Sequence, residues 1–173
     1  MLHLIEKARQ IKLLILDIDG VLTSGRIYYI ADGTEMRAFH VHDGLGIKLL
    51  QNAGIAVAII SGKKSEAAAR RMKDLNIQHV YLGNVDKMPA YEELKTKLNL
   101  TDEQIAYVGD DLPDLPPLLR AGLAITVPDA PFIIQEKAIY ITQKQAGNGA
   151  VREVCDMLLK AQNSYDAILK SYR

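Results

Sequence analysis

The stretch Ile11-Lys-Leu-Leu-Ile-Leu16, followed at once by Asp17-Ile-Asp19-Gly20, decides the fold and carries the first candidate site. An apolar run of this length, ended by an aspartate with a glycine soon after it, indicates a short buried strand. Side chains two apart on a strand point the same way, so Asp17 and Asp19 converge beyond its carboxyl end, where open α/β sheets bind ligands. Two carboxylates there repel each other unless a cation or a shared proton offsets the charge, which predicts a metal together with acid–base chemistry.

Length and composition limit the class of protein. The 173 residues fit one domain, 1–173, that buries roughly 70% of its unfolded surface. Lysine plus arginine and aspartate plus glutamate both total 21, so no net charge attracts nucleic acid or an anionic membrane. The single cysteine, Cys155, excludes an internal disulfide and is expected in the core. Since neither a membrane-spanning run nor a signal-peptide pattern is present, we expect a soluble cytoplasmic protein.

Short apolar strands alternate with helical stretches along the chain. Continuous apolar runs such as 55–60 are typical of strands covered on both faces. The alternation predicts an α/β fold, a doubly wound and mostly parallel sheet with right-handed crossovers. We expect strands at about 12–16, 55–60, 79–82, 105–108, 123–126 and 138–141, and helices at about 44–53, 65–75, 87–98, 113–121 and 150–162, the last extending toward Tyr172.

One segment breaks the alternation. The runs 26–30 and 35–39 flank Ala31-Asp32-Gly33-Thr34, and an Asp-Gly pair between two such runs is a strong hairpin signal. We therefore expect a β-hairpin flap at about 25–40, immediately after the two carboxylates. Tyr28 and Tyr29 fit hairpin packing or a subunit contact better than catalysis.

Three further strand ends carry reactive groups. Ser61-Gly62-Lys63 offers a hydroxyl and backbone N–H groups, although the serine would also suit a helix N-cap. Lys87 opens a helix, where its ammonium reaches a phosphate or remains a surface charge. The stretch 109–114, Gly-Asp-Asp-Leu-Pro-Asp, adds oxygen ligands that indicate Mg²⁺ rather than zinc, while Asp111 also suits a helix cap. Together these strand ends predict phosphoryl transfer.

The order and spacing of these four motifs resemble the haloacid dehalogenase superfamily of phosphatases. The resemblance implies that Asp17 attacks phosphorus and becomes an aspartyl phosphate. It implies that Asp19 protonates the leaving alkoxide and then activates the hydrolytic water. Ser61 and Lys87 would hold phosphoryl oxygens.

The same resemblance implies a Mg²⁺ site. The ion would lie between Asp17, the backbone carbonyl of Asp19, and Asp110. Asp114 would brace the metal shell or Lys87 rather than bind the metal.

A finer resemblance covers nearly the whole chain. The flap and the segments 39–47, 107–112 and 149–154 are similar to the 3-deoxy-D-manno-octulosonate 8-phosphate phosphatase family of lipopolysaccharide precursor synthesis. The 25 residues 62 to 86 between the serine and lysine motifs already hold a helix and a strand, so no cap domain fits there. The resemblance implies a homotetramer in which flaps and C-terminal segments of neighbours help close each site.

The finer resemblance also implies the contacts to a sugar-acid phosphate. The family usually has Asn and Arg at 40 and 42, Arg at 63, and Gly-Arg-Gly where this chain has Gly147-Asn-Gly149. Losing guanidinium groups removes bidentate carboxylate recognition, so a 2-keto-3-deoxy nonulosonate or sialic acid 9-phosphate is the alternative substrate. Solvated positions at the flap base and on helix faces are the structural alternative for several of these residues. The implied substrate contacts are Asp19, His40, Val41, His42, Asp43, Gly44, Lys48, Lys63, Arg71 and Lys87.

Two other function classes are compared with the phosphatase. A signalling receiver domain also uses an aspartyl phosphate, a hydroxyl, a lysine and acidic metal ligands on a doubly wound sheet. Receivers lack an acid–base group two residues after the phosphoacceptor, so Asp19 favours turnover. The complete set of reactive groups argues against a non-catalytic interaction subunit.

Overall fold

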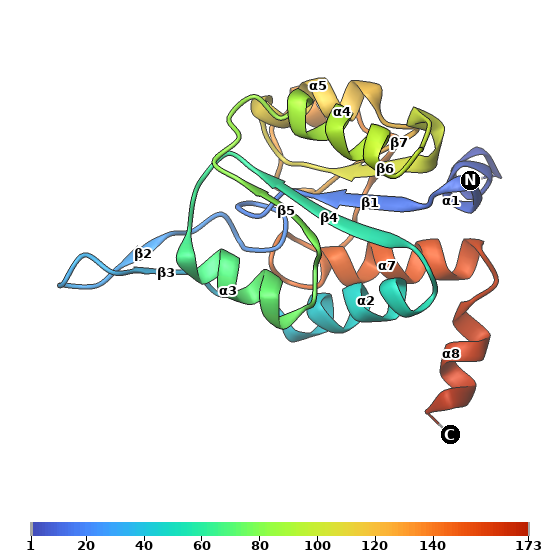
Figure 1. Cartoon of the computed structure of the whole chain (residues 1–173), viewed down its shortest axis with the longest axis horizontal. Helices are drawn as coiled ribbons and strands as arrows, with labels where there is room; N and C mark the ends of the chain where they lie inside the picture. The colour runs from blue at the N-terminus through green and yellow to red at the C-terminus, as the bar shows by residue number, and fades with distance from the viewer. Residues whose placement is uncertain (1, 173) are drawn as a thin grey trace.

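A computed structural model describes residues 2–172, which form a six-stranded parallel sheet with helices on both faces and a separate two-stranded hairpin (Figure 1). The sheet order is β5-β4-β1-β6-β7-β8, and every neighbouring pair is parallel. This arrangement confirms the predicted doubly wound α/β fold. The strands are β1 (Leu13–Leu16), β4 (Ala56–Ser61), β5 (His79–Leu82), β6 (Ile105–Val108), β7 (Leu123–Thr126) and β8 (Tyr140–Ile141).

The central strand is buried on both faces because its side chains alternate between two apolar cores. Leu14 and Leu16 join one core with α2 (Val41–Asn52), α3 (Glu66–Asp74) and α7 (Ala150–Ala161). Leu13 and Ile15 join the other with α4 (Met88–Lys97) and α5 (Leu115–Arg120). Burying one such side chain stabilises the fold by about 1.5–3 kcal/mol. Because β1 is buried on both faces, its carboxyl end, which Asp17 and Asp19 follow, is held in a fixed position.

The hairpin lies where the Asp-Gly signal predicts it. β2 (Tyr28–Tyr29) pairs antiparallel with β3 (Glu35–Met36), and Figure 1 shows the hairpin projecting away from the body of the molecule. In the turn, Gly33 has a φ of 84° and the Thr34 N–H donates to Asp32 Oδ1 at 2.8 Å. From Asp19 to Lys87 the chain holds only this hairpin, α2, β4, α3 and β5, so it has no cap domain there, as predicted.

Some helices differ from the sequence prediction. α1 (Leu2–Gln10) and the one-turn α6 (Phe132–Gln135) were not predicted. The helix expected at 113–121 begins as a 3₁₀ turn, η2 (Leu112–Asp114), which continues into the proline-containing α5. A second 3₁₀ turn, η1 (Asp102–Gln104), precedes β6.

The C-terminal segment is two helices rather than one. α7 ends at Ala161 and α8 (Tyr165–Ser171) follows as a separate helix, so the extension of one helix toward Tyr172 is wrong. Asn163 between them has a φ of 58°, in the left-handed region that a continuing α-helix does not contain. Figure 1 shows α8 leaving the body of the molecule at an angle to α7.

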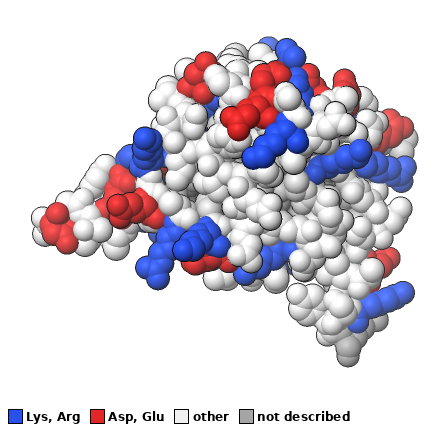
Figure 2. Space-filling model, in the orientation of Figure 1, with Lys and Arg blue, Asp and Glu red and all other residues white. Residues whose placement is uncertain are grey.

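Charge is mixed on the surface, in line with the balanced composition. Figure 2 shows lysine and arginine interspersed with aspartate and glutamate on the visible face, including the hairpin. Among residues 2–172, no helix combines the length and apolar content needed to cross a bilayer.

Candidate active site

Loops that follow four strands meet at the carboxyl edge of the sheet around a hollow of about 230 Å³. The hollow lies beside β1 and β6, where the strand order reverses and where doubly wound sheets place ligands. The structure thus brings together all four predicted motifs. The lining residues are Asp17, Asp19, Ser61, Gly62, Lys63, Lys87, Asp110, Asp111, Pro113 and Asp114.

A buried lysine connects two carboxylates at the floor of the hollow. Lys87 Nζ lies 3.0 Å from Asp17 Oδ1 and 2.6 Å from Asp114 Oδ1, and all three residues are buried. Asp114 Oδ2 also accepts hydrogen bonds from two backbone N–H groups of its own loop. Asp114 therefore braces Lys87, one of the two roles expected for it, while Lys87 holds the Asp17 carboxylate in place.

We expect Lys87→Ala to lower the free energy of unfolding by about 3–5 kcal/mol, because two buried carboxylates lose their cation. Burial disfavours the ammonium, but Asp17 and Asp114 offset this and raise the pKa of Lys87, so the loss is present at neutral pH. Denaturant unfolding measures it. The exposed Lys97 of the same helix is the matched control, and Lys97→Ala should change the value by about 0.5 kcal/mol at most. Equal effects of both substitutions would contradict this account.

The acidic groups around the hollow suit a divalent cation. Asp17, Asp110 and Asp114 each offer an oxygen, and these oxygens lie within 4.8 Å of one another. Burial and then the charge of Asp17 raise the pKa of Asp110 to about 8, and burial followed by Asp114 raises the pKa of Asp17 to about 6. Lys87 alone thus leaves negative charge uncompensated. Because the Asp114 oxygens are already hydrogen-bonded, Asp17 and Asp110 are the side chains that would hold Mg²⁺.

A glycine brings the loop after β1 close to this cluster. Gly20 has a φ of +96°, and a Cβ built there would lie 2.0 Å from Asp110 Oδ2. Any side chain at position 20 would therefore displace a predicted metal ligand. The Thr23 hydroxyl accepts hydrogen bonds from the N–H groups of Gly20 and Gly25 at 3.4 and 3.2 Å and holds the loop in this shape.

We expect Mg²⁺ to stabilise the protein more at about pH 8 than at about pH 5. The carboxyl pKa values of Asp17 and Asp110 are higher in the folded state than in the unfolded state. Without metal, the folded state therefore binds more protons, and the free energy of unfolding falls as pH rises from about 4 to about 8. A bound cation removes this loss and competes with the protons at low pH. Thermal unfolding with and without Mg²⁺ at both pH values measures it.

At a Mg²⁺ concentration about 100 times the dissociation constant, the gain should be about 2.7 kcal/mol. Asp110→Asn serves as the control and should lose most of the gain. The same rise in melting temperature at both pH values would contradict the assignment of these carboxylates to the metal.

The end of β4 contributes a hydroxyl and a second lysine. Ser61 is buried, and its Oγ accepts a hydrogen bond from the Lys63 N–H at 3.5 Å. Ser65, rather than Ser61, caps α3 by accepting from the Ala68 N–H, so the cap interpretation of Ser61 is wrong. Lys63 lines the hollow and forms an ion pair with Glu35 of the hairpin.

Arg37, which no sequence pattern marks as a site residue, contacts the predicted acid–base residue Asp19. Its Nε lies 2.7 Å from Asp19 Oδ1 and its Nη2 lies 3.1 Å from Asp19 Oδ2. Arg37 follows β3 in the returning arm of the hairpin. The alternating pattern of that arm gave no sign that this side chain turns back to the loop after β1.

The residues at the flap base do not line the hollow. His40 caps α2 by accepting from the His42 N–H at 3.3 Å, and their rings meet edge to face with centroids 4.9 Å apart. Val41 is exposed. Asp43 is buried, and its Oδ1 accepts from the Arg152 N–H at 2.8 Å, so it caps the first turn of α7.

The remaining predicted substrate residues occupy two different places. Arg71 of α3 reaches the start of α2, where a Cβ on Gly44 would lie 2.3 Å from its Nη2. Lys48 instead lines a hollow with Ala56 and His79, the first residues of β4 and β5. That hollow is at the opposite edge of the sheet, so this chain by itself does not bring Lys48 to Asp17.

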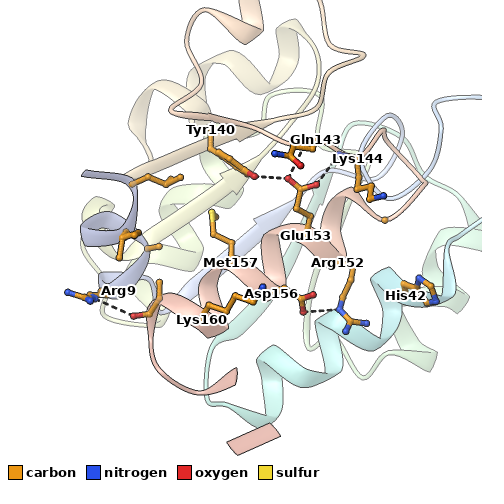
Figure 3. Close-up of a pocket in the computed structure, with 15 residues that line it drawn as sticks. Arg9, His42, Tyr140, Gln143, Lys144, Arg152, Glu153, Asp156, Met157 and Lys160 are labelled. Atoms are coloured by element: carbon orange, nitrogen blue, oxygen red, sulfur yellow. Dashed lines mark hydrogen bonds and ion pairs between the residues drawn. The ribbon is translucent and has the colours of Figure 1, made fainter. Parts of the chain in front are cut away.

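A larger hollow of about 720 Å³ runs along α1 and α7 (Figure 3). Figure 3 shows Tyr140 pointing to Glu153, which accepts from its hydroxyl at 2.6 Å and from two backbone N–H groups of the loop after β8. Arg152 Nε is paired with Asp156 at 2.8 Å. These carboxylates are engaged with the protein's own donors, and His42 is the one predicted site residue that lines this hollow.

Comparison with known proteins decides the family. A profile of haloacid dehalogenase-like hydrolases matches residues 77–154. A 3-deoxy-D-manno-octulosonate 8-phosphate phosphatase of Salmonella typhi is 46% identical over 164 residues, 95% of this chain and 87% of that protein. The corresponding Escherichia coli K12 protein is 46% identical over 162 residues, 94% of this chain and 86% of its own. The chain belongs to the 3-deoxy-D-manno-octulosonate 8-phosphate phosphatase family.

Solved structures of this phosphatase family agree. A Moraxella catarrhalis 3-deoxy-D-manno-octulosonate 8-phosphate phosphatase, solved with magnesium, phosphate and KDO, superposes with a TM-score of 0.98 at 45% identity, covering 100% of this chain and 99% of that one. A cobalt-bound Haemophilus influenzae phosphatase gives 0.89 at 42% identity, covering 93% and 94%. The predicted fold and the predicted enzyme class, a phosphoric monoester hydrolase, are confirmed. The relatives favour this class over a receiver domain or a non-catalytic subunit.

Proposed function

We propose that this protein hydrolyses 3-deoxy-D-manno-octulosonate 8-phosphate to the free sugar acid and phosphate, with Mg²⁺ as cofactor. The observation that carries the proposal is the buried Asp17 held by Lys87 beside Asp110, in a chain of this family. An oriented carboxylate next to a cation site is the arrangement that nucleophilic phosphoryl transfer needs.

The reaction divides into two steps on the chain's own residues. Asp17 attacks phosphorus and displaces the sugar alkoxide, which takes a proton from Asp19. Asp19 then takes a proton from a water molecule that attacks the Asp17-bound phosphoryl group and releases phosphate. Lys87 and Ser61 neutralise and hold phosphoryl oxygens, and Mg²⁺, when held by Asp17 and Asp110, would supply positive charge that offsets the negative charge of the phosphoryl group.

The substrate choice between an eight-carbon and a nine-carbon sugar acid is open to a direct test. Lys63 lines the hollow, where its ammonium is paired with Glu35, and a substrate carboxylate would have to compete with Glu35 for a lysine that lacks the fork of an arginine. Phosphate release from a panel of octulosonate 8-phosphates and nonulosonate 9-phosphates should give the highest kcat/KM for 3-deoxy-D-manno-octulosonate 8-phosphate. A preference for the 2-keto-3-deoxy nonulosonate or sialic acid 9-phosphate would overturn the substrate assignment and leave the phosphatase.

We also propose that the enzyme works as a homotetramer. Its hairpin exposes Tyr28, Tyr29, Ile30 and Met36, apolar surface that a neighbouring copy would cover, and the hollow at its base is open to solvent. Light scattering should give the mass of four chains, and Tyr29→Asp should weaken the assembly together with turnover. A fully active monomer would contradict the proposal.

The resemblance to the family supports a place in lipopolysaccharide precursor synthesis in the cytoplasm. Both remain predictions for this chain. The location is checked by fractionating cells and assaying phosphatase activity in the cytoplasmic and periplasmic fractions.

A further inference from the structure

The most highly connected cation near the active site is one that the mechanism above does not use. The side chain of Arg37 is shielded from solvent by its partners, and the residue as a whole is half-buried, although it belongs to an exposed hairpin. Its guanidinium contacts both oxygens of Asp19, Glu35 Oε2 at 2.5 Å and Ser65 Oγ at 2.7 Å. One side chain therefore joins the hairpin, the loop after β1 and the N-cap residue of α3.

Two of these contacts hold the guanidinium itself in place. Glu35 is part of β3, and the Ser65 hydroxyl also caps α3 by accepting the Ala68 N–H at 3.3 Å. With its position set by a strand and a helix terminus, Arg37 presents a fixed planar fork to Asp19. A fork of this kind determines the rotation of a carboxylate as well as its distance.

Asp19 needs such support more than Asp17 does. Asp17 is buried against Lys87, whereas the side chain of Asp19 is 24% exposed at the mouth of the hollow. A carboxylate offers about four lone-pair positions, and the two hydrogen bonds from Arg37 leave the others free to carry the proton that passes to the leaving group or to accept a hydrogen bond from water. The contact thus orients Asp19 without covering it.

We propose that Arg37 is a positioning residue for Asp19, which sets the carboxylate toward the departing oxygen and so makes general acid catalysis depend on the hairpin. The inference rests on the proposed phosphatase function. In a purely structural role, Arg37 would only fasten the hairpin to the domain. The two roles predict a different dependence of the loss in kcat/KM on the leaving group of the substrate.

The experiment uses the full-length enzyme with Mg²⁺ and a series of ring-substituted phenyl phosphates, with 4-nitrophenyl phosphate at one end and phenyl phosphate at the other. Nitrophenolate departs without a proton, whereas phenolate benefits from one. The value of kcat/KM covers the steps up to the first phosphoryl transfer, so it isolates the acid role of Asp19. For Arg37→Ala we expect a small loss with the nitrophenyl ester, rising to about 10²-fold with the phenyl ester.

A loss that is the same for every ester would overturn the proposal and assign Arg37 to the scaffold. Because the readout is a ratio between substrates, a reduced fraction of folded enzyme does not affect it. If Arg37→Ala does not fold, Arg37→Lys keeps the charge without the fork and should show the same trend to a smaller degree. The exposed hairpin residue Arg26 is the matched control, and Arg26→Ala should keep the wild-type ratio.

Two further measurements separate the possible failures. Added guanidinium should restore part of the phenyl ester activity of Arg37→Ala, and in the Asp19→Asn background the Arg37 substitution should cost little more. Independent, additive losses at Asp19 and Arg37 would contradict the inference. A wild-type enzyme that hydrolyses no phosphate ester would instead overturn the proposed function.

Discussion

We expect Asp17→Asn to reduce hydrolysis of the sugar-acid phosphate by at least about 10⁴-fold, as for other enzymes that lose their nucleophile. An asparagine at position 17 cannot form the aspartyl phosphate, which is an acyl phosphate, and it also weakens the site for Mg²⁺. Lys87 keeps its contact with Asp114, so the fold should persist. Phosphate release measures the loss, and thermal unfolding with light scattering verifies that fold and assembly are retained.

Asp111→Asn is the matched control for this substitution. Asp111 lines the same hollow but is exposed, and its Oδ1 caps η2 by accepting the Leu112 N–H at 2.8 Å. Asparagine caps helices nearly as well as aspartate, so turnover should stay close to wild type. Substantial hydrolysis by Asp17→Asn would show that another group attacks phosphorus.

The second large effect is expected at Asp19. Asp19→Asn should lower kcat by about 10²–10⁴-fold, because the amide neither protonates the alkoxide nor activates water. Steady-state kinetics with the sugar-acid phosphate measures it. Binding should change much less, since Lys87 and Ser61 remain to hold the phosphoryl oxygens.

Asp32→Asn provides the control for removing a carboxylate from this region. Asp32 lies in the hairpin turn, where asparagine also accepts the hydrogen bond from the Thr34 N–H. This substitution should leave kcat unchanged. Wild-type turnover by Asp19→Asn would remove the acid–base role and with it the reason for the contact from Arg37.

The sequence could predict those elements that a short local pattern specifies. The apolar run before Asp17 and the Asp-Gly pair at 32–33 are local signals, and both gave the correct element. The site followed because parallel strands end at one edge, which places the groups after β1, β4, β5 and β6 together without any knowledge of packing. Asp110 and Lys87 were assigned to the site on this ground.

The sequence could not predict contacts between segments that lie far apart along the chain. The contact of Arg37 with Asp19 requires the hairpin arm to fold back over the loop after β1, which no spacing reveals. Lys48 was assigned by resemblance; within one chain α2 places it at the other edge of the sheet, and its contact with substrate stays a prediction. The single turn of α6 is too short for a periodic pattern to emerge.

The central claim is that Asp17 carries the phosphoryl group during turnover. Borohydride reduces an aspartyl phosphate to homoserine. The test is to quench the enzyme with borohydride during hydrolysis and to sequence the tryptic peptide 13–26 by mass spectrometry. We predict homoserine at position 17 only when substrate and Mg²⁺ are both present. Unmodified Asp17 in enzyme quenched during rapid turnover, or homoserine at position 19, would contradict it.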